Sequence, residues 1–338
     1  MRVLFKKELK TNSIISVIGL AKNTGKTTTL NKLIEEAKFL HKKIGVISTG
    51  RDGERMDVFT GKAKPRIFVP AGSVFVTTEE SLGMCEAPGK LLKKTKYMTS
   101  MGRVLILKAL KPGFVEVAGP GSVNETIEIV KLLRKEYKVG RVFVDGSINR
   151  TAIITSRLKC GVVLATGAVL GELSEIIKET LLKITTLTLP VVDAKIKKQI
   201  LQKKCAGTVS FNKRKEASVL PHSLLHYLEN INKGLIERPE YIFTGGAVTE
   251  LMTEALLKKK LVVELIALDA SKIHIGPAAF ERWTISGGTF KVINKLNLVA
   301  ITCNPYNPMG TSYEPKRFVK AIEKGSLGIP VYDVKQGS

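Results

Sequence analysis

The chain has 338 residues, of which 44% are hydrophobic and 25% are charged. This is an ordinary globular composition, and no apolar run approaches the roughly 20 residues that a membrane-spanning helix needs. The first residues, MRVLFKKELKTNS, lack an apolar stretch followed by a cleavage site, so we expect no membrane span and a cytoplasmic protein. The length favours two domains over one.

The charge is the unusual bulk property, because 54 Lys and Arg against 30 Asp and Glu leave a net charge of +24. A basic field attracts acidic partners, nucleic acid among them. The lysines are spread through every segment, however, and no aromatic RNA-binding pattern interleaves with them. A solvated, lysine-rich surface is the preferred interpretation, and nucleic acid is retained as a less favoured partner.

Apolar runs alternate with amphipathic stretches from Ser13 onward, which predicts an α/β fold with a mostly parallel sheet. Between the first two runs, residues 27–42 carry apolar side chains at helical spacing, and this helix is expected directly behind a glycine-rich loop. The predicted strands are Ile14–Ile18, Ile44–Ser48, Phe114–Val117, Val142–Val144, Gly161–Leu164 and Leu187–Val192.

Two segments interrupt this rhythm. Residues 62–108 have a strand-and-turn pattern and are expected to form a small β-rich insertion. Residues 198–237 are polar and lysine-rich, and a new alternation begins after them. We therefore expect a P-loop nucleotide-binding domain at 1–235 and a second, smaller α/β domain at 236–338.

The strongest motif is ISVIGLAKNTGKTTT, in which Gly25, Lys26 and Thr27 follow an apolar strand and open a helix. This is the context of a P-loop, which binds ATP or GTP with Mg²⁺. Lys26 can reach the β and γ oxygens, and the Thr27 hydroxyl can contact Mg²⁺. The predicted nucleotide-binding residues are Asn23, Thr24, Gly25, Lys26, Thr27 and Thr28.

The motif departs from the usual spacing GxxxxGK[ST]. That spacing requires its first glycine at position 20, where this chain has Leu20, and Gly19 stands one residue earlier. The sequence therefore predicts a variant loop. No guanine-specific NKxD pattern accompanies it, which favours ATP over GTP.

A P-loop needs acidic partners for Mg²⁺ and for water, and these sit at the ends of neighbouring strands. Asp145 ends the apolar run VFV and is the predicted Mg²⁺ partner, with a turn-capping role as the alternative. Asp52 and Glu54 follow the second strand. They are the candidate residues for ordering water, Asp52 also for the metal, with a plain polar loop as the equal alternative.

Three further loops are candidate ligand or partner surfaces. The stretch from Glu116 to Ser122 precedes a helix expected near Asn124 and could sense the γ-phosphate or be turn chemistry alone. The segments TGGAVTE, from Thr244, and ITCNPYNPMGTSYEP, from Ile301, each follow a strand. Such loops often hold ligands in open α/β sheets, so both are candidate effector sites.

With these motifs the chain resembles the P-loop subunit of the reactivating factor for lysine 5,6-aminomutase, an adenosylcobalamin enzyme of lysine fermentation. The segments that carry the resemblance are GLAKNTGKTTTLN, ISTGRDGERMDVFTGKAKPRIFVPAG, VEVAGPGS, VDGSINR and NPYNP. The resemblance implies a chaperone-like ATPase that works with a MutS-like second subunit to expel damaged cobalamin from the aminomutase. It assigns nucleotide binding to Gly25, Lys26, Thr27 and Asp145. No DxHxxG cobalamin motif is present, so the chain is expected to act on the enzyme from outside.

Two other classes stay open at this point. A P-loop small-molecule ligase or kinase, similar to dethiobiotin synthase, would need a second polar pocket near the γ-phosphate, for which residues 116–122 are the local feature. A polynucleotide kinase would use the positive charge directly, and its binding would weaken steeply with salt.

Overall fold

The computed structural model describes residues 3–49, 51–52, 66–146, 157–202, 207–220, 238–307 and 310–336. By its internal contacts the chain forms two compact units, unit 1 (residues 1–180 and 297–338) and unit 2 (residues 181–296). The α-helices are α1 (Lys6–Thr11), α2 (Lys26–Phe39), α3 (Glu79–Leu82), α4 (Val123–Lys135), α6 (Leu173–Leu187), α7 (Ala194–Gln202), α9 (Glu250–Lys258), α10 (Pro277–Ile285) and α11 (Pro315–Glu323).

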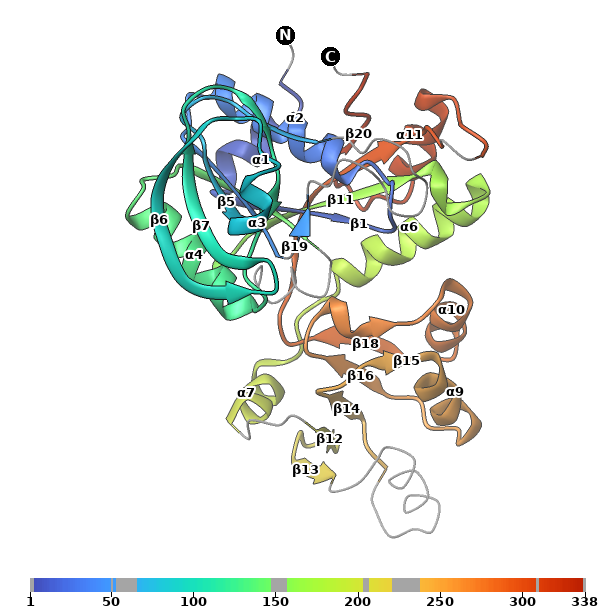
Figure 1. Ribbon diagram of the computed structural model, residues 1–338. Helices are drawn as coiled ribbons and strands as arrows, with labels where there is room; N and C mark the ends of the chain where they lie inside the picture. The colour runs from blue at the N-terminus through green and yellow to red at the C-terminus, as the bar shows by residue number, and fades with distance from the viewer. Residues whose placement is uncertain are drawn as a thin grey trace. The chain divides into compact units, whose positions relative to one another are not determined.

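Unit 1 is built on a mostly parallel sheet, which in the described part of the chain has nine strands (Figure 1). Their order is β20 (Val331–Tyr332), β19 (Asn297–Asn304), β11 (Gly161–Gly167), β1 (Ile14–Gly19), β10 (Arg141–Asp145), β2 (Ile44–Ser48), β5 (Val74–Thr78), β7 (Gly102–Ala109) and β6 (Gly89–Thr99). Neighbours from β20 to β5 pair in parallel, and β7 and β6 continue the sheet in antiparallel fashion. The fold is therefore α/β with a large, mostly parallel central sheet.

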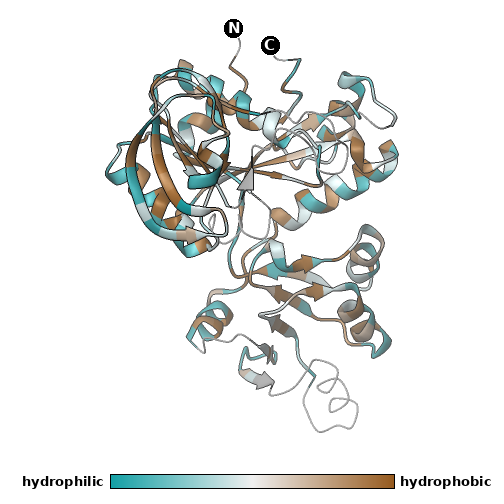
Figure 2. Cartoon of the chain, in the orientation of Figure 1, coloured by the Kyte–Doolittle hydropathy of each residue, from teal (hydrophilic) through white to brown (hydrophobic). Residues whose placement is uncertain are grey.

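The apolar runs form strands because the parallel sheet is covered on both faces. Every residue of β2 and β11 is buried, as are the first five of β1, and such strands need continuous hydrophobic sequence. Figure 2 shows this hydrophobic character in the central strands. Helix α2 buries Leu30, Leu33 and Ile34 in the core of unit 1. It also buries Glu36, whose carboxylate accepts hydrogen bonds from Leu4 N and Phe5 N.

Two short antiparallel pairs complete the described strands of unit 1. Strand β3 (Arg51–Asp52) pairs with β9 (Val117–Ala118), and β4 (Ile67–Val69) pairs with β8 (Gly113–Val115). The predicted strand over 114–117 is thus two strands interrupted at Glu116. Helix α4 follows, and its start is fixed because the Ser122 hydroxyl accepts a hydrogen bond from Glu125 N at 3.2 Å.

Unit 2 has its own sheet in the order β13 (Ala217–Leu220), β12 (Thr208–Phe211), β14 (Tyr241–Thr244), β16 (Glu264–Ala267) and β18 (Thr289–Val292). A further pair joins β15 (Val248–Thr249) to β17 (Ile273–His274), and short 3₁₀ turns are η1 (Ala168–Leu170) in unit 1 and η2 (Ala270–Lys272) in unit 2. The fully buried Trp283 on α10 packs with Phe290 on β18.

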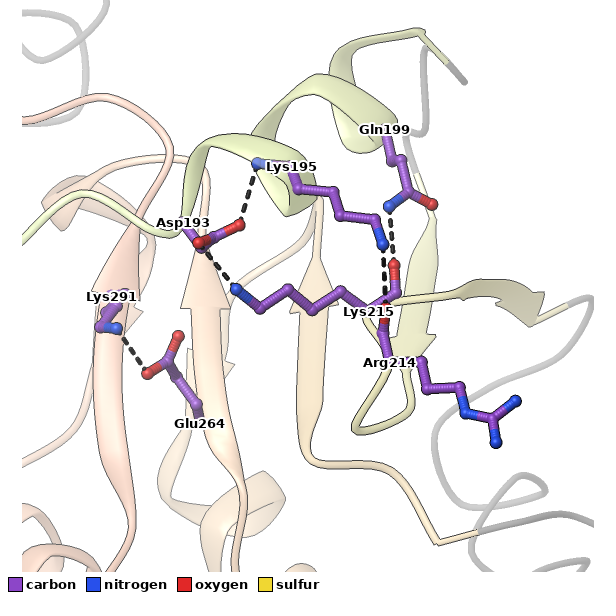
Figure 3. A network of polar contacts seen from close by, with 7 residues as sticks. All are labelled: Asp193, Lys195, Gln199, Arg214, Lys215, Glu264 and Lys291. Atoms are coloured by element: carbon purple, nitrogen blue, oxygen red, sulfur yellow. Dashed lines mark hydrogen bonds and ion pairs between the residues drawn. The ribbon is translucent and has the colours of Figure 1, made fainter.

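A polar cluster in unit 2 holds α7 to the hairpin of β12 and β13 (Figure 3). The Asp193 carboxylate accepts hydrogen bonds from Lys195 N at 2.9 Å and from Lys215 Nζ at 2.8 Å. Lys195 Nζ donates to Arg214 O, and Gln199 Nε2 donates to Lys215 O. The hydrogen bond and charge of Lys215 hold the pKa of Asp193 below its ordinary value.

Two sequence predictions differ from the structure. The predicted strand over 187–192 is wrong, because α6 runs through Leu187 and only Val191 makes a β-bridge, to Val292. Of the predicted strand only Leu187 lies in α6, and Pro190, which cannot donate a ladder hydrogen bond, stands in the middle of the remaining segment.

The predicted domain division at residue 235 also differs from the observed units. Position 235 lies in the segment 221–237, outside the described residues. Residues 297–338 return to unit 1 because β19 pairs with β11 in the central sheet. The segment 62–108 is rich in strands where it is described, and β5, β7 and β6 extend that same sheet. No helix in the described ranges combines the length and apolar character needed to cross a bilayer.

Candidate functional site

The candidate site lies where the carboxyl ends of several parallel strands of unit 1 meet. Residues 19–25, which we call the glycine loop, connect β1 to α2. Strand β10 lies on one side of β1 and β11 on the other, and β19 is the next strand beyond β11. Ligands in open α/β sheets bind at this edge, so the glycine loop has the position that its motif requires.

Neighbouring strands hold the glycine loop from outside. Leu20 N donates to Ala165 O of β11 at 3.0 Å. Asn304, the last residue of β19, donates from Nδ2 to Asn23 O at 3.1 Å. Because both contacts are long-range, the loop conformation depends on strands encoded far away in the sequence.

Gly19 explains the variant spacing of the motif. A Cβ at Gly19 would lie 2.7 Å from the Thr24 hydroxyl oxygen and 3.0 Å from Ala21 O. The Thr24 hydroxyl in turn donates to Ala21 O at 3.0 Å, which closes the loop back over Gly19. The close backbone approach therefore requires a glycine at position 19, and Leu20 only extends the loop by one residue.

Gly25 forms the N-cap of α2 in a left-handed conformation, with φ of 89°. A Cβ there would lie 3.1 Å from Asn304 Cβ, so both the backbone conformation and the space favour glycine. Helix α2 starts at Lys26, and Gly25 O accepts from Thr29 N at 2.9 Å. The first N–H groups of a helix have no partner within it and attract anions.

Lys26 reaches across to the neighbouring strand. Its Nζ lies 2.8 Å from Asp145 Oδ1, and Asp145 is the last residue of β10. The Asp145 side chain is 0% exposed, whereas that of Lys26 is 24% exposed. A fully buried carboxylate is costly unless it is paired, so this arrangement keeps a negative charge beside the first turn of α2.

Ser48 and Thr49 contact Asp145 from the neighbouring strand β2 and the residue after it. Ser48 ends β2 and lies opposite Asp145 in the parallel pairing, and Thr49 N donates to Asp145 O at 2.8 Å. Within the described part of the chain, the buried Ser48 hydroxyl has no hydrogen-bond partner. Sequence reasoning missed both residues, although their place after an apolar run marks them as strand-end polar groups.

The loop before α4 packs closely on the same strand end. A Cβ at Gly119 would lie 1.7 Å from Ser48 O, which no side chain can tolerate. Glu116, by contrast, is 1% exposed and accepts a hydrogen bond from the Ser81 hydroxyl at 3.3 Å. The part of this loop that meets the candidate site is therefore Gly119, and the Glu116 carboxylate contacts α3.

The remaining predicted residues have different outcomes. Thr27 and Thr28 lie half-buried in the first turn of α2. The structure gives only the backbone of Asp52, in β3, where it pairs with Val117, and Glu54 lies outside the described residues. The structure thus brings Lys26 and Asp145 together, with Thr27 next to Lys26 in α2, while the roles of Thr27, Asp52 and Glu54 remain predictions.

A small cavity opens behind the first turn of α2. It is lined by Thr24, Gly25, Thr28, Asn304 and Lys335, among others, and by the ends of β19 and of the C-terminal segment. The second predicted effector loop, from Ile301, therefore begins beside the glycine loop, whereas the first, from Thr244, belongs to unit 2. The sequence feature that marked the loop from Ile301 was its Asn- and Pro-rich segment directly after a strand.

The described residues offer few metal ligands at this site. In the described ranges no three His, Cys, Asp or Glu side chains form a group that could hold a metal. Mg²⁺ in nucleotide sites is bound through one or two protein oxygens, phosphate oxygens and water, so a carboxylate and a hydroxyl suffice. Burial raises the pKa of Cys160 to about 12 and also raises that of Cys303, which disfavours the thiolate form that binds metals in these two residues.

Comparison of the chain with protein-family models finds no matching family, and comparison with curated proteins finds no matching relative.

Proposed function

We propose that the chain binds ATP with Mg²⁺ at the glycine loop and hydrolyses it. The observation that carries the proposal is the 2.8 Å contact between Lys26 Nζ and the buried Asp145 carboxylate, beside a glycine-capped helix start. A cation on the first helical turn, a strand-end carboxylate and free helix N–H groups are the parts from which P-loop sites are built.

Each residue has a defined task in this proposal. The N–H groups of residues 23–28 donate to phosphate oxygens, with the helix dipole behind them. Lys26 exchanges its contact with Asp145 for the β- and γ-phosphates. Thr27 and Asp145 hold Mg²⁺, which neutralises charge that develops on the phosphates.

The water that attacks the γ-phosphate needs an acceptor that orients it. We assign this task to Asp52 or Glu54, which follow β2. Their alternative role is to couple hydrolysis to a movement of the chain. Ser48 is a further candidate for contacting this water, because its hydroxyl is buried beside Asp145.

The sequence resemblance supports a more specific form of the proposal. The chain would be the ATPase subunit of a reactivating factor that, with a MutS-like second subunit, promotes release of damaged cobalamin from lysine 5,6-aminomutase. Hydrolysis by the isolated chain would be slow, because an ATPase that is coupled to a partner protein reaches its full rate only when the partner is bound. The ligase or kinase alternative would place a second polar pocket at residues 116–122. Within that stretch Glu116 is buried and accepts a hydrogen bond from Ser81, so the reactivating role is the form of the proposal that we prefer.

The test is ATP hydrolysis by the purified chain alone, and then with the second subunit and aminomutase that carries damaged cobalamin. The proposal predicts faster hydrolysis together with recovery of mutase activity. Hydrolysis without any response to the aminomutase would reject the reactivating role and leave the ATPase intact. Fast turnover that requires only a small acid or an RNA end would instead favour the ligase or kinase class.

A further inference from the structure

ATP has a nucleoside part as well as phosphates, and none of the tasks assigned above concerns it. The proposed Mg²⁺ ligand Asp145 lies on β10, on one side of β1, whereas β11 and β19 lie on the other side. With the metal on the β10 side, the β19 side of the glycine loop is left for the nucleoside. A residue that contacts the base there rests on the proposed function and completes it.

The segment after β19 begins in contact with the glycine loop. Asn304, the last residue of β19, donates from Nδ2 to Asn23 O at 3.1 Å. Tyr306 follows two residues later, and its N–H donates to Asn304 Oδ1 at 3.4 Å. Two residues of extended chain span at most about 7 Å, so the backbone of Tyr306 lies close to the glycine loop.

Hydrogen bonds hold the segment that carries Tyr306. Tyr313 N donates to Pro305 O at 2.9 Å, just before Tyr306. Asn307 Nδ2 donates to Ala168 O at 3.4 Å, just after it. The backbone on each side of Tyr306 is therefore fixed, and a ligand that binds there has little ordering of this segment to bring about.

The Tyr306 ring itself faces solvent, since the residue is 55% exposed. The Lys335 ammonium lies over this ring, 6.0 Å from its centroid. Lys335 also lines the small cavity beside Gly25 and Thr28. It therefore lies next to both the exposed ring and the first turn of α2, which places the ring at the edge of the candidate site.

We propose that Tyr306 binds the base of the nucleotide by stacking. A nucleobase is flat and has two apolar faces, and an aromatic side chain covers such a face well. With the triphosphate at the glycine loop, the purine lies on the exposed ring of Tyr306. The Lys335 ammonium adds positive charge beside a ligand that carries several negative charges.

The test compares a ligand that has a base with one that has none. The ligands are the Mg²⁺ complexes of the non-hydrolysable β,γ-imido analogue of ATP and of tripolyphosphate, and calorimetry measures their binding to the full chain. Tyr306→Ala should bind the ATP analogue about tenfold or more weaker and tripolyphosphate less than about twofold weaker, because only the first ligand loses a stacking contact. An equal loss for both ligands would overturn the proposal, since Tyr306 would then only support the glycine loop. Unchanged binding of the ATP analogue would overturn it as well.

Two control variants separate the ring from its hydroxyl and from the removal of any exposed ring. Tyr306→Phe keeps the ring and should bind the ATP analogue within about twofold of wild type. Phe39→Ala removes a ring that is 50% exposed at the far end of α2, and both affinities should stay within about twofold of wild type. A loss in Tyr306→Phe as large as that in Tyr306→Ala would assign the contact to the hydroxyl and contradict stacking.

Stacking also has a spectroscopic readout. The fluorescence of 2-aminopurine riboside triphosphate falls when its base stacks on an aromatic ring, so wild type should quench it and Tyr306→Ala should quench it far less. Equal quenching by the two proteins would place the base elsewhere. Failure of wild type to bind either the ATP analogue or tripolyphosphate would reject the proposed nucleotide site itself, and the base contact with it.

Discussion

Gly25 and Asn304 lie in direct contact, so that the end of β19 sets the space available at the start of α2. A Cβ on Gly25 would come within 3.1 Å of Asn304 Cβ, and Asn304 Nδ2 donates to Asn23 O next to it. The C-terminal segment thus shapes the glycine loop, although the motif itself lies near the N-terminus.

The contact between Gly25 and Asn304 leads to a first prediction. Gly25→Ala should reduce ATP affinity about tenfold or more, because the φ of 89° and the close approach both oppose a side chain. Gly72→Ala is the matched control, since Gly72 has φ of 83° but no atom within 4 Å of its Cβ position. Each substitution should cost about 1 kcal/mol of stability from backbone strain. Equal ATP affinity in both variants, measured by calorimetry, would show that the loop geometry is not required.

The second prediction concerns Gly119. Gly119→Ala should destabilise unit 1 by about 3 kcal/mol or displace its loop, because the Cβ would fall 1.7 Å from Ser48 O. Gly121→Ala, in the same loop, has no atom within 4 Å and should leave stability within about 0.5 kcal/mol of wild type. Thermal unfolding followed by circular dichroism compares them. A similar melting temperature for the two variants would contradict the packing described.

The third prediction separates the function of Asp145 from its packing. Asp145→Asn should raise the Mg²⁺ concentration for half-maximal hydrolysis about tenfold or more, since the neutral amide is a poor Mg²⁺ ligand. Stability should stay within about 1 kcal/mol, because the substitution removes the cost of a buried charge together with the Lys26 ion pair. Unchanged Mg²⁺ dependence with a large loss of stability would assign Asp145 a structural role alone.

The fourth prediction concerns acid sensitivity in unit 2. Lys215 lowers the pKa of Asp193 below 3.8, so their contact stabilises the fold above that pH and is lost as pH falls through the folded pKa. Asp193→Asn keeps the oxygen that accepts from Lys195 N and removes the charge. Trp283 is the only tryptophan and lies in unit 2, so its fluorescence reports the melting of this unit. The variant should melt earlier than wild type near neutral pH, and the difference should shrink as the pH falls below the ordinary aspartate pKa of 3.8. A constant difference at all pH values would rule out the charge as the cause.

Much of unit 1 could be predicted from sequence because its signals are local. The apolar runs of β1, β2, β10 and β11, the helix after the glycine loop and the strand-end position of Asp145 all follow from hydrophobic pattern and motif spacing. Lys26 and Asp145 were therefore expected at one site, and the 2.8 Å contact agrees with that expectation.

The rest depends on long-range pairing, which has no local signal. Strand β19 pairs with β11 and so brings Asn304 to the glycine loop. The local sequence around residue 300 does not indicate this pairing. The same holds for Ser48, whose relevance comes from its place opposite Asp145. The strand predicted over 187–192 failed for another reason: its first residue ends the helix α6, and Pro190 leaves only an isolated bridge at Val191.

The central claim is that this chain hydrolyses ATP through Lys26. The most direct measurement is Mg²⁺-dependent phosphate release by wild type, Lys26→Ala and the control Lys38→Ala, which removes an exposed lysine from the last turn of the same helix. The account predicts a loss of about a hundredfold or more for Lys26→Ala and wild-type turnover for Lys38→Ala. Equal phosphate release by all three proteins would contradict it.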